Sequence, residues 1–168
     1  MKILVTHEVF PPEKFGGGER ILWEFLTRLK DRGFDITVLT TGNPKIKEYN
    51  GIPTLRIPIN RYLMNLAVPY VMKYGKRADI IQTVTFNACL PSFIGAKILK
   101  KPIVNFIMGL HKDTWFEMHN WFIATVFKYV ERLQIFRDYD KVIFFSEPSR
   151  SKALESGMPE EITEVIPP

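Results

Sequence analysis

Short apolar segments alternate along the chain with longer amphipathic ones. Runs rich in apolar and β-branched residues predict strands at 2–6, 34–41, 54–59, 79–84, 102–107, 140–146 and 163–168. Between them, apolar residues recur at helical spacing, which predicts helices at 19–32, 62–74, 87–100, 114–136 and a short one from about Pro148 to Gly157. This alternation predicts an α/β fold: a Rossmann-like, doubly wound, mostly parallel sheet flanked by helices, with residues 1–168 as one domain.

Three of these helices carry end signals. Gly33 follows the first helix as a C-cap residue, and Thr114-x-x-Glu117 reads as a capping box that opens the long helix at 114–136. The helix at 62–74 is interrupted at Pro69 or begins there.

The loop after the first strand contains three consecutive glycines, Gly16, Gly17 and Gly18, directly before a helix. In an open α/β sheet this loop lies at the carboxyl ends of the strands, where ligands bind. Glycines let backbone N–H groups approach a ligand, and the helix N-terminus adds unpaired donors and a positive dipole end. The loop therefore predicts a site for phosphate or another anion, with a flexible turn as the alternative. Its spacing matches neither G-x-G-x-x-G nor a P-loop.

Charge is distributed unevenly along the chain. From Arg56 to Lys112 there are nine basic residues and one acid, Asp79, so this segment carries +8 and the remainder −3 of the total +5. Such a segment favours anionic partners, namely phosphates, acidic lipid or nucleic acid, or else consists of solvated helix ends. Without a nucleic-acid-binding motif to accompany the charge, we expect no nucleic-acid partner.

Composition excludes several kinds of chemistry. The single cysteine, Cys89, cannot form an internal disulfide or a cysteine-cluster zinc site, and we expect it to be buried. Three histidines without an H-E-x-x-H pattern predict no protein-bound metal, and G-x-S-x-G does not occur. The N-terminus lacks a signal-peptide pattern, so we expect a cytoplasmic location.

The order of these segments resembles the amino-terminal domain of GT-B fold nucleotide-sugar glycosyltransferases, specifically glycosyltransferase family 4. Members open with a strand, a "PP" turn, a "GG-x-E" loop, a helix and "RGH-x-V-x-V-x-T"; the corresponding elements here are Pro11-Pro12, Gly17-Gly18-Glu19 and Arg32-Gly33-Phe34. Later segments are also similar, because "ADIIQTVTF" resembles the family's "DVIHAH" strand and "DKVIFFSEPSRSKALESGMPEEITEVIPP" its "AD-x-VI-x-VS … VIPNG" segment. The resemblance spans nearly the whole chain.

The resemblance implies an enzyme that transfers a sugar from a nucleotide-sugar donor to a saccharide or lipid-linked acceptor, usually with retention of configuration. The nucleotide sugar is a substrate, and no cofactor is implied. In such enzymes the glycine-loop amides lie beside the donor diphosphate, which carries over to Gly16, Gly17 and Gly18. Glu19 is a candidate for hydrogen-bonding an acceptor hydroxyl, although an acid in a first helical turn is also explained by the helix dipole.

Two departures from the family pattern affect these expectations. Where members often have "HG", this chain has Met108-Gly109, so His111 is the candidate replacement for the catalytic histidine and Lys112 a second cation for phosphate; a surface histidine is the alternative. The chain ends at "VIPP", where the family continues into its donor-binding domain. We therefore expect this carboxy-terminal domain to be absent and the chain alone to transfer sugar negligibly.

Other residues have two readings. His7 and Glu8 end the first strand and could contact a reacting hydroxyl, or be satisfied loop side chains. His119 is read as a packing or surface residue. The segment 61–77 combines aromatic residues with Arg61, Lys73, Lys76 and Arg77, which predicts peripheral contact with an acidic membrane surface. A stand-alone, non-catalytic module that binds an anion or a saccharide remains the alternative function.

Overall fold

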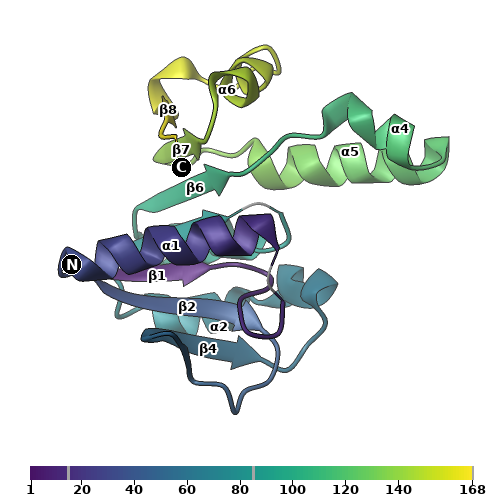
Figure 1. The fold of residues 1–168 in the computed structure, drawn as a ribbon. Helices are drawn as coiled ribbons and strands as arrows, with labels where there is room; N and C mark the ends of the chain where they lie inside the picture. The colour runs from purple at the N-terminus through teal and green to yellow at the C-terminus, as the bar shows by residue number, and fades with distance from the viewer. Residues whose placement is uncertain (15, 85, 168) are drawn as a thin grey trace.

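A computed structural model of the chain describes residues 1–14, 16–84 and 86–167, and shows one sheet with helices on both faces (Figure 1). The strands are β1 (Lys2–Thr6), β2 (Asp35–Thr41), β3 (Glu48–Tyr49), β4 (Ile52–Ile57), β5 (Ile80–Val84), β6 (Ile103–Ile107), β7 (Lys141–Phe144) and β8 (Thr163–Val165). Their order in the sheet is β3-β4-β2-β1-β5-β6-β7-β8, and all neighbours pair in parallel except β3 and β4. The predicted doubly wound, mostly parallel sheet is confirmed.

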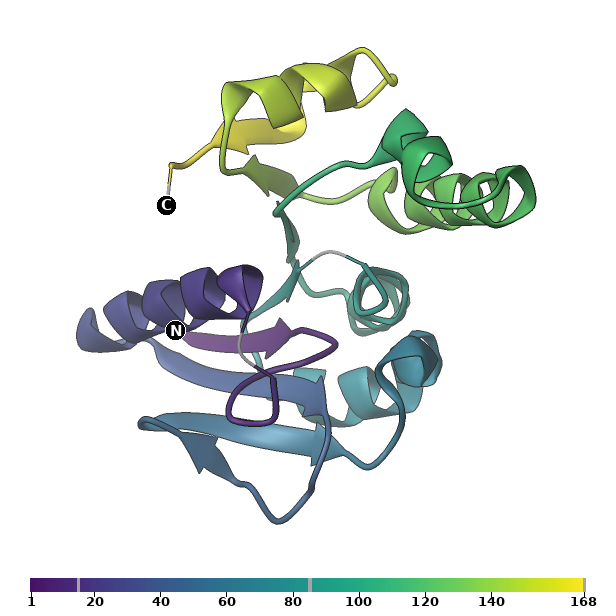
Figure 2. The same ribbon diagram turned by 45° about the vertical axis from the view of Figure 1, so that its right-hand side comes forward.

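The α-helices are α1 (Gly17–Asp31), α2 (Val68–Gly75), α3 (Cys89–Leu99), α4 (Trp115–Met118), α5 (Trp121–Ile135) and α6 (Glu147–Leu154). In the part of the chain that the structure describes, the 3-10 helices are η1 (Arg61–Leu66), η2 (Lys112–Thr114) and η3 (Glu160–Ile162). Helix α1 lies over one face of the sheet, whereas α2 and α3 pack together on the other (Figure 2). No helix among the described residues is long and apolar enough to cross a bilayer.

Alternating side chains of β1 divide the core between these two faces. Ile3 and Val5 pack in the cluster that contains Leu22 and Leu26 of α1, whereas Leu4 packs in the cluster that contains Val71 of α2. The period-2 geometry of a strand requires this division, because successive side chains point to opposite faces. Burial on both faces explains why the strands read as nearly continuous apolar runs.

Two segments differ from their predictions. The helix predicted over 114–136 is broken at His119, where the backbone is extended, and α5 begins after Asn120, whose side chain accepts a hydrogen bond from the Ile123 amide. Thr114 does precede a helix, the short α4, but its hydroxyl donates to the His111 carbonyl and does not cap that helix, whereas Asn120 caps α5 with its side chain.

The β3–β4 hairpin was not predicted, because β3 contains only two residues. Of the two alternatives at Pro69, an interrupted helix or a helix that begins there, the second holds, because α2 begins at Val68 and η1 before it is a separate helix. The last predicted strand is β8, whose predicted end at Pro168 lies outside the described residues.

Candidate functional site

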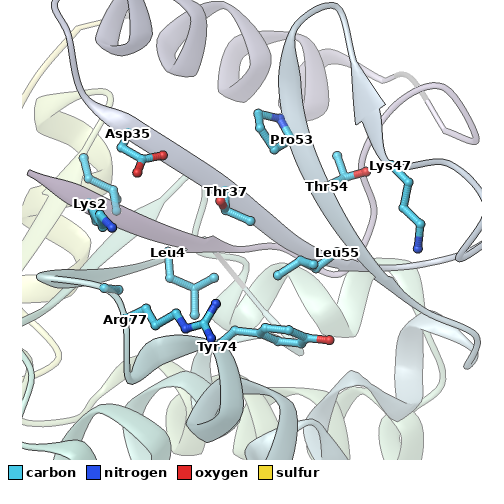
Figure 3. A pocket seen from close by; sticks show the side chains of 12 residues that line it. Lys2, Leu4, Asp35, Thr37, Lys47, Pro53, Thr54, Leu55, Tyr74 and Arg77 are labelled. Atoms are coloured by element: carbon cyan, nitrogen blue, oxygen red, sulfur yellow. The ribbon is translucent and has the colours of Figure 1, made fainter.

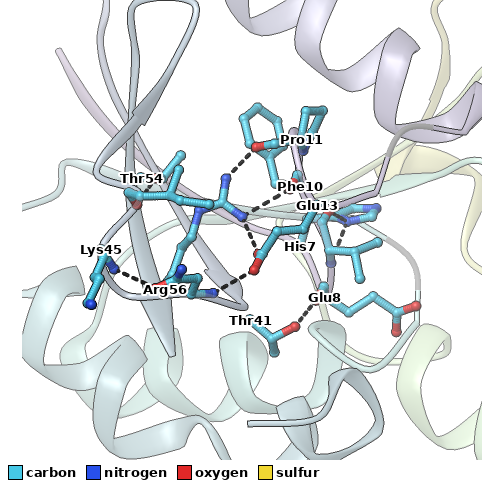
Figure 4. Close-up of polar contacts among 12 residues, drawn as sticks. His7, Glu8, Phe10, Pro11, Glu13, Thr41, Lys45, Thr54 and Arg56 are labelled. Carbon is cyan, nitrogen blue, oxygen red and sulfur yellow. Dashed lines mark hydrogen bonds and ion pairs between the residues drawn. The ribbon is translucent and has the colours of Figure 1, made fainter. Parts of the chain in front are cut away.

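The loop between β1 and α1 lies at the carboxyl edge of the sheet, as expected for a ligand-binding loop (Figure 1). A buried arginine, Arg56 of β4, fixes its first half (Figure 4). Its Nη1 atom donates to the Phe10 carbonyl at 3.0 Å and to Glu13 Oε2 at 2.9 Å, and its Nη2 atom donates to the Pro11 carbonyl. Glu13 in turn accepts from the Asn43 amide. These contacts attach the loop to β4 and to the turn after β2.

Burial lowers the pKa of Arg56, and the Glu13 carboxylate opposes that effect. The guanidinium of Arg56 is therefore buried, where a charge is costly, and its two Nη atoms are paired with two carbonyls and a carboxylate, whereas its buried Nε has no hydrogen-bond partner in the described part of the chain. The sequence held a signal for this role, because Arg56 interrupts the otherwise apolar strand "TLRIPI".

His7 follows β1 directly and is buried. Its Nδ1 atom lies 2.5 Å from the Val9 carbonyl, and burial lowers its pKa to about 4. Glu19 raises this pKa and Arg61 lowers it, so both charges act on the ring. The imidazole is neutral at pH 7 and lies within the electrostatic reach of the glycine loop and of Arg61.

The glycine loop forms the N-terminus of α1. The Gly16 amide donates to Glu19 Oε2 at 2.8 Å, so a carboxylate already occupies one of the donors expected to face a phosphate. A Cβ on Gly18 would meet the Met108 sulfur at 3.0 Å, which places Met108 beside the loop. A Cβ on Gly17 would meet nothing within 4 Å.

Helix α5 fixes the backbone of His111 and Lys112 through hydrogen bonds. The buried Glu131 carboxylate accepts from the amides of both residues at 2.8 Å and from Trp115 Nε1 at 3.2 Å. The His111 ring lies 4.4 Å from the Trp115 ring and 5.7 Å from that of Phe86, whereas the Lys112 ammonium donates to the Lys152 carbonyl. The structure therefore brings Gly18 and Met108 together, and places His111 among aromatic side chains.

A Cβ on Gly109 would also meet nothing within 4 Å, so no close neighbour requires a glycine at position 17 or 109. His119 is exposed and its ring lies 5.9 Å from the Trp115 ring, in line with a surface or packing role. Cys89 is buried, and burial raises the pKa of its thiol to about 12.

A cavity of about 400 Å³ opens between η1, the loop after β5, and helices α4 and α5. Its polar end is Glu8, whose carboxylate pairs with Arg61 and accepts from Asn87 Nδ2 at 2.5 Å. The aromatic side chains that line it are Tyr62, Phe86, Trp115, His119 and Phe127. Of the polar set, sequence reasoning named Glu8 and Arg61 but missed Asn87 and Glu131, whose partners are distant in the chain.

Another hollow, of about 470 Å³, lies at the opposite end of the strands, between β1, β2, β4 and α2 (Figure 3). Its lining includes the charged side chains of Lys2, Asp35 and Arg77 and the apolar side chains of Leu4 and Leu55. It contains none of the residues predicted for the donor, the acceptor or catalysis, although Arg77 of the predicted membrane contact lines it. Within residues 1–14, 16–84 and 86–167, no three histidine, cysteine or acidic side chains are grouped so that they could hold a metal ion.

The profile of the family described as Glycosyltransferase Family 4 matches residues 15–168. No curated protein matches the chain.

Solved structures resemble the fold. Anabaena HepE, in complex with UDP and glucose, is 24% identical with a TM-score of 0.71, and the match covers 99% of this chain and 44% of HepE. Sucrose-phosphate synthase from Thermosynechococcus elongatus is 17% identical with a TM-score of 0.68, covering 99% of this chain and 47% of that one. UDP-N-acetylglucosamine 2-epimerase from Rickettsia bellii is 19% identical with a TM-score of 0.63, and the match covers 98% of this chain and 44% of the epimerase. The chain thus spans less than half the length of these proteins, and the epimerase shows that the fold alone does not imply sugar transfer.

Proposed function

The chain belongs to glycosyltransferase family 4, and on this premise we propose that it is the acceptor-side, amino-terminal domain of a retaining hexosyltransferase. The enzyme would transfer a sugar from a nucleotide-sugar donor to a saccharide or lipid-linked acceptor, with a second, carboxy-terminal domain holding most of the donor. Similarity to HepE, whose structure contains UDP and glucose, supports a nucleotide-sugar donor.

The observation that carries the proposal is the open space at the glycine loop. Gly17 has no neighbour within 4 Å of a Cβ position and no left-handed backbone angle, so the fold tolerates a larger residue there. A ligand that lies against the loop would explain why position 17 is a glycine, because a side chain there would occupy the ligand's space. The amides that begin α1 have no partner within the helix, which suits them to bind the donor diphosphate.

The chemical role of the loop is electrostatic. As the bond between the anomeric carbon and the diphosphate oxygen breaks, its electron pair leaves with the diphosphate, and amides fixed at that position stabilise the growing negative charge. The amides of Gly17 and Gly18 supply this role directly. At Gly16 the diphosphate competes with the Glu19 carboxylate, because two anions cannot share one N–H donor. Displaced from Gly16, Glu19 is able to accept a hydrogen bond from an acceptor hydroxyl.

We assign His111, Gly109 and Lys112 to the transferred sugar and the diphosphate. All three follow β6 at the carboxyl edge of the sheet, and Met108, which precedes them in the chain, lies beside Gly18 of the glycine loop. The Lys112 ammonium donates an exposed hydrogen bond to the Lys152 carbonyl, and it must break this bond to contact a phosphate. The chain's own contribution to the reaction is therefore a set of donors and cations along one edge of the sheet.

The experiment that tests this function uses the full gene product isolated from its source cells. Incubation with a panel of nucleotide sugars and acceptors should release nucleoside diphosphate only when an acceptor is present, and NMR of the product should show the donor's anomeric configuration. Inverted product would refute the retaining assignment. Binding of UDP without any transfer would instead favour the stand-alone binding module.

A membrane contact through 61–77 belongs to the same proposal. Leu63 and Leu66 of η1 and Tyr70 of α2 are exposed there. Lys73 of α2 and Lys76, which follows that helix, are also exposed. Apolar side chains beside cations suit the surface of an acidic bilayer, where a lipid-linked acceptor would be found. The protein should sediment with vesicles containing anionic lipid and not with purely zwitterionic ones; equal sedimentation with both would refute the contact.

A further inference from the structure

The cavity beside Glu8 has a wall built from four apolar aromatic rings, and the His119 imidazole lines it as well. Tyr62 comes from η1, Phe86 from the segment after β5, Trp115 from α4 and Phe127 from α5. The Trp115 and Phe127 rings are 5.1 Å apart, and Phe86 is 6.4 Å from Trp115. These rings present flat apolar surfaces that suit a ligand with an apolar face, such as the C–H face of a sugar ring.

The opposite end of the cavity is polar and held in place by a chain of side-chain hydrogen bonds. Asn87 donates to Glu8, Asn65 donates to Asn87 at 2.9 Å, and Gln134 donates to Asn65 at 3.0 Å. Each carboxylate oxygen of Glu8 has one partner, Arg61 or Asn87, and each has a second lone pair. Glu8 is therefore an oriented acceptor that can take a further hydrogen bond from a ligand hydroxyl.

Charge decides which ligands suit this cavity. Among the described residues that line it, the charged side chains are Glu8, Glu131 and Arg61, so the lining carries a net charge of −1. Arg61 is paired with Glu8, and Glu131 is buried and bonded to two backbone amides. An anionic ligand would meet two fixed carboxylates and one guanidinium, whose Nη2 is paired with Glu8 and whose buried Nε has no hydrogen-bond partner among the residues that the structure describes.

We propose that this cavity binds the acceptor of the transfer reaction as an uncharged sugar ring, stacked on the aromatic wall with a hydroxyl donated to Glu8. The inference rests on the proposed function, because it names the acceptor class of that reaction. It distinguishes neutral sugars from phosphorylated sugars and uronic acids, which have the same rings with a negative charge. The local charge thus selects against anions even though the chain as a whole carries +5.

The first test compares acceptors with the full gene product. Neutral methyl glycosides should be used with kcat/KM at least about tenfold higher than the same rings bearing a 6-phosphate or a 6-carboxylate, a difference of ~1.4 kcal/mol. Equal or greater use of the charged rings, with transfer observed, would overturn the inference while the proposed function stands. Saturation-transfer NMR with the same glycosides covers the converse case, because binding of the neutral rings without transfer would overturn the proposed function alone. Absence of both binding and transfer would overturn both.

The second test separates stacking in the cavity from general surface effects. Tyr62 and Tyr129 are equally exposed, at 69% and 70%, but only Tyr62 lines the cavity. The Tyr62→Ala variant should raise the KM for the neutral acceptor at least about fivefold and leave the KM for the donor unchanged, because the donor binds at the glycine loop. The Tyr129→Ala variant should change neither. Equal effects of the two variants on the acceptor KM would contradict the placement of the acceptor in this cavity.

Discussion

The carboxylate of Glu131 on α5 accepts a hydrogen bond of 2.8 Å from the backbone amide of His111. Its other oxygen accepts from the Lys112 amide at the same distance and from the Trp115 indole. A buried acid far along the chain therefore fixes the segment on which the candidate catalytic histidine lies.

Replacing Glu131 with Gln should loosen that segment. The amide –NH2 of Gln cannot accept a hydrogen bond, so at least one of the backbone amides would be buried without a partner, at a cost of about 1–3 kcal/mol. Urea unfolding should show this loss, and hydrogen exchange at the His111 and Lys112 amides should accelerate. Glu117→Gln, at an exposed position on α4, is the control and should leave both measurements unchanged.

Gly17→Ala should reduce ligand binding without reducing stability. The added methyl group meets no protein atom within 4 Å, so the free energy of unfolding should change by less than about 0.5 kcal/mol. The same methyl would separate the loop amide from a diphosphate, and the affinity for UDP, measured by calorimetry, should fall about tenfold, or ~1.4 kcal/mol.

Gly33→Ala provides the opposite pattern as a control. Gly33 has a φ of +86°, where a Cβ is strained, so this variant should lose about 1 kcal/mol of stability and keep its UDP affinity. Unchanged UDP affinity in Gly17→Ala would argue against the glycine loop as the diphosphate site.

Stability should fall as the solution is acidified through the titration of His7. In the folded chain the pKa of His7 is about 4, against the ordinary value of 6.5, so between these values the unfolded state binds more protons. Its contribution to stability is complete above pH 6.5 and is lost as the pH falls toward 4. The loss between pH 7.5 and 5.0 should be about 2 kcal/mol.

Urea unfolding at both pH values measures this dependence. His7→Asn should weaken it, whereas His119→Asn should retain it because His119 is exposed. An identical pH dependence in His7→Asn and the unsubstituted chain would show that other groups cause it.

Arg56→Leu should destabilise the loop that precedes the glycines. The substitution removes the donor of the Phe10 carbonyl, the Pro11 carbonyl and Glu13 Oε2. The free energy of unfolding should therefore fall by about 2–4 kcal/mol. Arg20→Gln removes an exposed ion pair with Glu24 and should cost less than about 0.5 kcal/mol in the same thermal unfolding measurement. Similar losses in both variants would indicate that Arg56 has no special structural role.

The sequence by itself determined the alternation of strands and helices apart from β3 and the break at His119, the doubly wound sheet and the position of the glycine loop at its carboxyl edge. These features follow from local periodicity and from glycine, which act over a few neighbouring residues. The same local reasoning failed at His119, because Thr114 and Asn120 are both good cap residues and only packing selects between them.

Only the tertiary structure decided which side chains surround the site. Arg56 and Phe10 are separated by 46 positions, Asn87 and Glu8 by 79, and Glu131 and His111 by 20, and no local pattern relates these pairs. Parallel strands bring such residues together because their crossovers return the chain repeatedly to one edge of the sheet. The charge of the cavity likewise differs from that of the basic segment that contributes to it, since folding places Glu8 and Glu131 beside Arg61.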